Sequence, residues 1–139
     1  MGRKERSGPP DEKVTINLGP VDLGRIDLLV EQGFYASRTD AIRSATRQLL
    51  DGHKVDIDEA VRRNSIAVGV VHWGRDSLEQ AKRRNERLAV RVMGVLHLGS
   101  DVTPDLADEV IESIRVLGHF SAPAPVRDRL KAKMGKLPQ

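Results

Sequence analysis

The stretch EKVTINLGP, residues 12–20, alternates polar and apolar side chains without a break from Lys13 to Leu18. A period of two residues is typical of a β-strand with one buried face. The residues that follow, up to about position 50, have helical spacing instead, so no second strand lies within hairpin distance. Because an unpaired strand edge invites another chain, we expect this strand to pair antiparallel with the same strand of a second copy.

Two helices are predicted after this strand. Proline is tolerated in the first turn of a helix, so Gly19-Pro20 indicates a helix start, and Gly33 is suited to end that helix in a left-handed conformation. Ser37 is a good N-cap for the second helix, and Asp40 completes an arrangement like a capping box. A strand and two helices in about forty residues rarely form a monomeric core without a metal, disulfides or association. The chain has no cysteine, so association is the remaining option.

The order and spacing of these residues form a recognisable pattern. It consists of KVTINL at 13–18, Pro20, Leu23, Ile26-Asp27, Leu29-Val30, Gly33, Tyr35 and SRTDAIRSA at 37–45. With this pattern, residues 13 to about 50 resemble the ribbon-helix-helix superfamily of DNA-binding proteins, of the Arc, MetJ and CopG type. The resemblance implies an α+β domain over residues 13–51 that forms an intertwined homodimer through a two-stranded antiparallel ribbon.

The outward side chains of such a ribbon are Lys13, Thr15 and Asn17. A two-stranded ribbon fits the major groove of DNA, and these three residue types suit the hydrogen-bonding edges of bases. The resemblance assigns base contact to these positions. The alternative interpretation is that they only face water, as the polar side of any amphipathic strand does.

A second predicted DNA contact is the start of the second helix, at Ser37, Arg38 and Thr39. Backbone N–H groups at the positive end of a helix dipole favour a phosphate, and the family clamps the DNA backbone at this place. The alternative is that Ser37 only caps its own helix. Residues 1–12 are polar and are expected to form a disordered basic arm, whose Arg3, Lys4 and Arg6 are possible auxiliary DNA contacts.

The second half of the chain contains an internal repeat. GVVHWGRD at residues 69–76 aligns with GVLHLGSD at 94–101, and RVMG at 91–94 aligns with RVLG at 115–118. Each unit has an apolar strand with a glycine, a polar turn and a short helix, near 76–86, 103–112 and 124–134. After a linker at 52–56, residues 57–134 are therefore predicted to form a small parallel strand-helix module, short and solenoid-like, followed by a tail at 135–139. Exposed sheet ends predict oligomerisation or partner binding through this module.

His72 and His97 occupy equivalent positions in neighbouring units, so we expect them to lie side by side. Two stacked histidines suit a metal ion or a pH sensor, but they are also what a duplicated strand would leave without any function. The third unit has Ser121 at this position, so no metal and no other cofactor is predicted. Trp73 is predicted to pack rather than to stack on a ligand.

Several function classes are excluded or disfavoured by composition. We find no phosphate-binding glycine loop, nucleophile motif or Cys–His pair, so the chain is not expected to be an enzyme. No apolar run spans a bilayer and no signal peptide is visible, so we expect a cytoplasmic, nucleoid-associated protein without membrane contact. A calculated pI of about 9.5 permits a polyanionic partner.

The sequence thus predicts a dimeric, sequence-specific protein that binds double-stranded DNA, a transcriptional regulator of prokaryotic type. Two alternatives remain open at this point. One is an antitoxin that represses its own toxin pair, and the other is a structural protein that coats DNA or polymerises.

Overall fold

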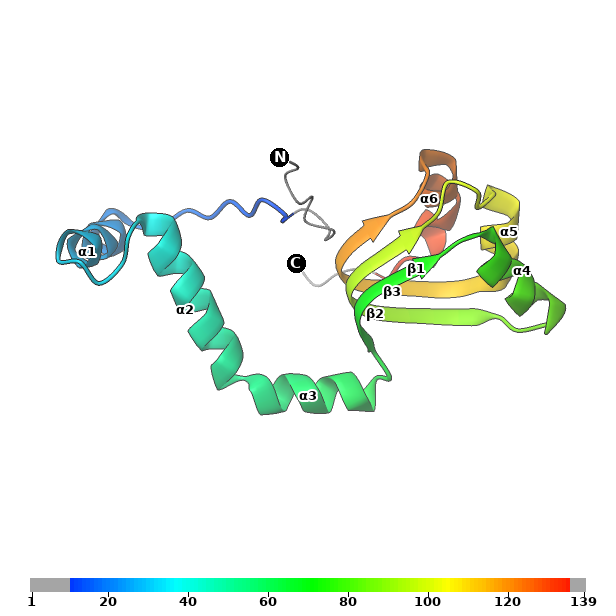
Figure 1. Ribbon diagram of the computed structural model, residues 1–139, viewed down its shortest axis with the longest axis horizontal. Coiled ribbons are helices and arrows are strands. Elements are labelled where there is room, and N and C mark those ends of the chain that lie inside the picture. The colour runs from blue at the N-terminus through cyan, green and yellow to red at the C-terminus, as the bar shows by residue number, and fades with distance from the viewer. Residues whose placement is uncertain (1–10, 136–139) are drawn as a thin grey trace, which may run out of the picture. The chain divides into compact units, whose positions relative to one another are not determined.

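The computed structural model describes residues 11–135, and these fall into two compact units that divide between Asp58 and Glu59 (Figure 1). Residues 11–58 are called the N-terminal unit below, and residues 59–135 the C-terminal unit. The predicted basic arm with Arg3, Lys4 and Arg6 and the predicted tail lie almost entirely outside the described residues. Within residues 11–135, no helix is both long and apolar enough to cross a membrane.

The helices of the N-terminal unit begin where the sequence predicts. Helix α1 spans Pro20–Glu31 with its proline in the first turn, and Gly33 behind it has a φ of +84°. Helix α2 spans Arg38–Gly52, and helix α3, Lys54–Arg63, begins two residues after α2 ends and continues into the C-terminal unit. The segment 52–56, predicted as a linker, is thus mostly helical. Acidic Asp56 in the first turn of α3 and two arginines in its last turn suit the helix dipole.

The strand predicted at residues 13–18 is not formed in the single chain. Residues 11–19 run as an extended segment before α1 and belong to no sheet (Figure 1). A β-strand requires ladder hydrogen bonds to a neighbour, and no described strand of the chain pairs with this segment. Pairing between two copies therefore stays a prediction.

The N-terminal unit also lacks a core of its own. Among residues 11–58, Ala41 is the one buried residue. Large apolar side chains of the extended segment, of all three helices and of the turn between α1 and α2 are exposed: Val14, Ile16, Leu18, Val21, Leu28, Leu29, Phe34, Leu49, Leu50 and Val55. An exposed apolar surface of this extent is typical of an interface with another chain.

The C-terminal unit consists of three strands, each followed by a helix. Its elements are β1 (Ala67–Trp73), α4 (Arg75–Arg83), β2 (Leu88–Leu98), α5 (Pro104–Val110), β3 (Ile111–Ser121), α6 (Ala124–Leu130) and a 3-10 turn at Lys131–Lys133. The strands form a parallel sheet in the order β1-β2-β3. The last predicted helix, near 124–134, is shorter than expected, because Met134 leaves the helical path and forms a β-bridge with Ile114.

A row of glycines crosses this sheet and accounts for the glycine in each sequence unit. Gly69 pairs with Gly94 and Gly94 with Gly118, and their φ angles are +120°, +130° and +126°. A Cβ atom on Gly94 would lie 2.2 Å from the carbonyl oxygen of Gly69, and one on Gly118 equally close to that of Gly94. Since L side chains avoid this backbone region, conformation requires glycine at all three positions, and at Gly94 and Gly118 space requires it as well.

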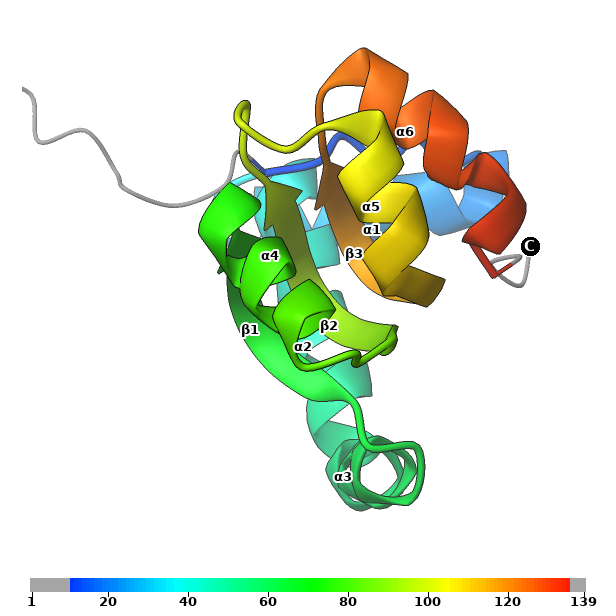
Figure 2. The same cartoon turned by 90° about the vertical axis from the view of Figure 1, so that its right-hand side faces the viewer.

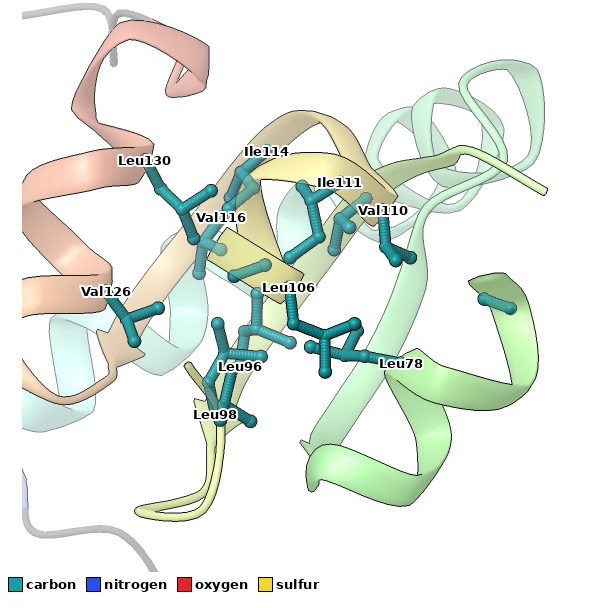
Figure 3. Packing of buried hydrophobic residues seen from close by; sticks show 14 of the residues in the cluster. Leu78, Leu96, Leu98, Leu106, Val110, Ile111, Ile114, Val116, Val126 and Leu130 are labelled. Atoms are coloured by element: carbon teal, nitrogen blue, oxygen red, sulfur yellow. The ribbon is translucent and has the colours of Figure 1, made fainter. Parts of the chain in front are cut away.

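Helices α4, α5 and α6 all lie on one face of the sheet (Figure 2). The core between the sheet and these helices is aliphatic and closely packed (Figure 3). Its largest fully buried side chains are Leu78, Leu96, Leu98, Val110, Ile111, Ile114, Val126 and Leu130. Trp73 is partly buried and packs against this cluster, as predicted.

Candidate nucleic-acid interface

The extended segment lies against helix α2 and forms an apolar groove with it. Val14 and Ile16 line this groove on one side, and Ile42 of α2 lines it on the other. Thr15 and Asn17 do not line it, so the alternation expected of a ribbon holds at these two positions. Lys13 does line the groove, next to Val14. Thr15 and Asn17 are exposed, as DNA base contacts must be before DNA binds.

The start of α2 is capped in the way its sequence predicts. Ser37 is the N-cap in an extended conformation, and its Oγ accepts a hydrogen bond from the Asp40 backbone N–H at 3.1 Å. Asp40 Oδ2 in turn accepts a hydrogen bond from the Ala36 N–H at 3.0 Å. The first intrahelical bond of this turn runs from Ala41 N to Ser37 O, so the amides of Arg38 and Thr39 precede the helical ladder.

These amides face two opposing electrostatic influences. The helix dipole places partial positive charge at this end, and that charge favours a phosphate. The Asp40 carboxylate lies in the same turn and repels an anion. A phosphate would therefore gain from cationic help close to this turn, and Arg38 is the cation that the sequence places there.

The side chain of Arg38 is already held by an ion pair within the N-terminal unit. Its Nε and Nη2 atoms donate to the two carboxylate oxygens of Asp27 at 2.6 and 2.7 Å, which fastens the start of α2 to α1. The hydrogen bond from Arg38 lowers the pKa of Asp27 below its ordinary value, and the pKa of Arg38 is raised in return. A guanidinium has five N–H donors, so this arrangement leaves donors for a phosphate.

Sequence reasoning did not identify Asp27 as a partner of Arg38. The two residues are eleven positions apart, on different helices, so neither helical nor strand spacing joins them. The ribbon-helix-helix pattern includes Asp27, but only as one of its matching residues. The turn between α1 and α2, which decides this contact, has no local sequence signal that fixes its geometry.

The two predicted neighbours His72 and His97 do lie side by side. Their rings stack with centroids 4.9 Å apart and planes inclined by 17°. His97 Nδ1 is 3.1 Å from Ser121 Oγ, so the row continues into β3 as the sequence alignment indicates. Within residues 11–135, no three His, Cys, Asp or Glu side chains come together in a way that would hold a metal ion.

Comparison with known proteins places these features in a family. The model of the Ribbon-Helix-Helix transcriptional regulator family matches residues 9–127, well beyond the predicted 13–50. A candidate nickel-responsive regulator of Methanocaldococcus jannaschii is 30% identical over 125 residues, which cover 89% of this chain and 85% of that protein. A relative of the same description from Methanococcus maripaludis is 26% identical over 125 residues, which again cover 89% of this chain and 85% of that protein.

A shorter similarity links the chain to the transcriptional regulator CdrS of Halobacterium salinarum. The two are 36% identical over 42 residues, which cover 30% of this chain and 76% of CdrS. No solved structure matches the chain. Since the family model covers most of the sequence, including the sheet of the C-terminal unit, the chain belongs to the ribbon-helix-helix family of transcriptional regulators.

Proposed function

We propose that the chain is a homodimeric, sequence-specific regulator that reads the major groove with a β-ribbon formed by residues 13–18 of two copies. The observation that carries this proposal is the state of these residues in the single chain. Val14, Ile16 and Leu18 are 80%, 55% and 40% exposed on an extended segment that has no strand partner. Family membership makes a second copy of the same segment the natural partner.

The energetics of association indicate that the dimer needs more apolar contacts than those of the ribbon. Burying an aliphatic side chain of this size stabilises by about 1.5–3 kcal/mol, and the dimer would bury three from each copy. Association costs roughly 4–15 kcal/mol, so the ribbon needs further apolar contacts to form a stable dimer. The exposed apolar side chains of α1 and α2, such as Leu28 and Leu49, supply them.

In the proposed complex the two sides of the ribbon have different tasks. Val14, Ile16 and Leu18 face the helices, while Lys13, Thr15 and Asn17 face the base edges. The Arg38 and Thr39 amides at the start of α2, behind the Ser37 cap, meet the phosphates on either side. The Asp27–Arg38 ion pair orients the guanidinium for this contact. Residues 57–134 would hold several such dimers together on adjacent DNA sites.

Selection of bound duplexes from a random pool at physiological salt tests this proposal. We expect an enriched motif with two-fold symmetry, and an Asn17→Ala variant that relaxes its base preference. Salt-sensitive binding without any enriched motif would contradict base readout, because phosphate contacts alone give sequence-independent affinity. That outcome would favour the alternative of a DNA-coating protein.

Nickel response, which the names of two relatives suggest, is a second candidate function. The stacked pair of His72 and His97 is the observation in its favour, since imidazole is a nickel ligand. The described residues of one chain nevertheless bring no third ligand to this pair, so they do not form a complete nickel site. We expect DNA affinity to be equal with nickel and with a chelator. Nickel-dependent tightening that His97→Ala removes would establish the second function.

A further inference from the structure

An open polar pocket lies near the end of the C-terminal sheet at which β2 and β3 begin. The first half of β2 contributes Arg91, and the first half of β3 contributes Ser113 and Arg115. Asn64, directly after α3, and the segment 132–135, behind α6, add to the lining. The pocket has a volume of about 430 Å³, which is within the range of small-molecule sites. It thus joins four segments that are far apart in the sequence.

The charge of this pocket has one sign. Among the described residues that line it, the charged ones are Arg91, Arg115 and Lys133, and none is acidic. Lys133 is already engaged, because its Nζ donates to the carbonyl oxygens of Asp108 and Ile111 and pairs with the Asp108 carboxylate. The two arginines are therefore the cations that a ligand would meet.

The two arginines lie side by side on neighbouring strands. Arg91 and Arg115 are register partners in the parallel pairing of β2 with β3, which sets their backbones about 4.8 Å apart. Like charges at directly opposed positions destabilise a sheet. Arg91 Nη1 donates to the Asn64 carbonyl oxygen at 2.9 Å, whereas Arg115 makes no hydrogen bond or ion pair with any described residue. An anion between the two guanidinium groups would relieve their repulsion.

We propose that this pocket binds a small phosphorylated anion, inorganic phosphate or a phosphate monoester, between Arg91 and Arg115. A guanidinium donates two parallel hydrogen bonds to phosphate oxygens, and two such groups suit a doubly charged tetrahedral anion with more acceptors than a carboxylate offers. The hydroxyl of Ser113, two residues before Arg115 on the same side of β3, adds a further donor. The site lies within the C-terminal unit, so it does not depend on the ribbon or on the proposed function.

A free anion fits this arrangement better than the DNA backbone does. The phosphates of a duplex follow one another along the groove, and proteins meet them with cations and N–H groups spread over a surface. Here two cations from register-paired positions share one pocket and converge on one anion. Contact with DNA is therefore an outcome that the test has to distinguish.

Calorimetric titration of the full chain with inorganic phosphate, at neutral pH and constant ionic strength, tests the site. We expect saturable binding, which Arg115→Gln should weaken about tenfold or more through the loss of charge-assisted hydrogen bonds. Since Arg115 has no described partner to lose, this variant should stay folded. Arg115→Lys keeps the charge but not the planar fork, and should recover only part of the affinity.

Thermal unfolding gives a second readout, in which the sign of the change is informative. In chloride of equal ionic strength, Arg115→Gln should unfold at the same temperature as the original chain or higher, because it removes the like-charge contact. In phosphate the original chain should be the more stable of the two, because a bound ligand stabilises the folded state. Arg87→Gln, at an exposed position of the same unit outside this pocket, should change neither readout.

Several results would overturn the proposal. One is phosphate binding that does not exceed the effect of chloride at equal ionic strength. Another is an equal loss of affinity in Arg115→Gln and Arg87→Gln, which would indicate diffuse charge attraction. Acetate bound as tightly as phosphate would overturn the assignment of the ligand. Displacement of phosphate by a duplex whose own affinity Arg115→Gln lowers would show that the arginines contact the DNA backbone instead.

Discussion

The two units of the chain bury their apolar side chains to very different extents. In the C-terminal unit a continuous aliphatic core lies between the sheet and its helices, and residues such as Leu78 and Leu96 are completely buried. In the N-terminal unit only Ala41 is buried, although the segment 13–18 and the helices have as clear an apolar period. Apolar periodicity therefore indicates that a side chain will be buried, but not whether its own chain buries it.

This difference assigns separate roles to the two units. The C-terminal unit has a core of its own and is expected to be stable by that packing. On the proposal above, the N-terminal unit needs a second copy before its strand, its core and its DNA-reading surface form. Substitutions that prevent dimerisation of the N-terminal unit are thus expected to abolish DNA recognition as well. Substitutions in the C-terminal core are expected to lower the stability of that unit without this effect.

The largest expected effect comes from charging the apolar side of the ribbon. Ile16→Asp would place an unpaired carboxylate between two copies, so we expect monomers in sedimentation and a loss of DNA affinity of about a hundredfold or more. Gln48→Asp, an exposed position on α2, serves as a control for added negative charge. If the Ile16→Asp variant remained dimeric and bound its site, the N-terminal unit would not depend on this segment.

Truncation of a buried side chain in the C-terminal unit should lower the stability of that unit and leave DNA binding unchanged. Leu96 is completely buried, so Leu96→Ala should lower the free energy of unfolding by about 2–5 kcal/mol. Thermal unfolding measures this change, with the exposed Val70→Ala as its control. Affinity for a single duplex site should stay the same. A parallel loss of affinity would show that the two units fold as one.

A base contact in the N-terminal unit should have a smaller and more selective effect. Asn17→Ala removes a side chain that the proposal places on a base edge, at a cost of about 1–3 kcal/mol for the selected site. Titration of a scrambled duplex in parallel should reveal little change. Equal losses on both duplexes would contradict a base contact at Asn17.

Arg38→Ala should have the mildest and least selective effect of the series. We expect weaker binding to all sequences and a salt slope reduced by about 0.9 for each lost phosphate contact. Asp27→Asn is the matched variant, because it disrupts the ion pair and keeps the arginine. If Asp27→Asn lowered affinity as much as Arg38→Ala does, orientation by the ion pair would matter as much as the phosphate contact.

The same pair gives a direction for the pH dependence of the N-terminal unit. Arg38 holds the pKa of Asp27 below its ordinary value, so the contribution of the pair to stability is present above the unfolded pKa. It is lost as the pH falls through the lowered, folded pKa. Solvent screens this exposed pair, and Asp27→Asn should therefore remove only a shallow acid dependence.

Local signals in the sequence predicted a large part of the fold. Pro20, Gly33 and Ser37 mark helix ends through backbone preferences that act within a few residues. The stacking of His72 on His97 follows from a sequence alignment of two strands, because the parallel register preserves it. Such features need no knowledge of distant contacts.

Features that depend on tertiary geometry were not predictable in this way. The Arg38–Asp27 pair joins two helices that lie on either side of a turn. Helix α3 takes in most of the segment 52–56 that was predicted as a linker. The recognised motif ends near residue 50, although the family extends to 127, since the later strands use common aliphatic residues. The predicted strand at 13–18 has no partner among the described strands, and its pairing with a second copy stays a prediction.

Amide hydrogen exchange tests most directly whether a second copy completes the N-terminal unit. Residues 13–18 would be compared with β2 in the original chain and in the Ile16→Asp variant. We predict protection of both segments in the original chain, and loss of protection at 13–18 alone in the variant. Unprotected amides at 13–18 in the original chain, or protection that survives Ile16→Asp, would contradict the account.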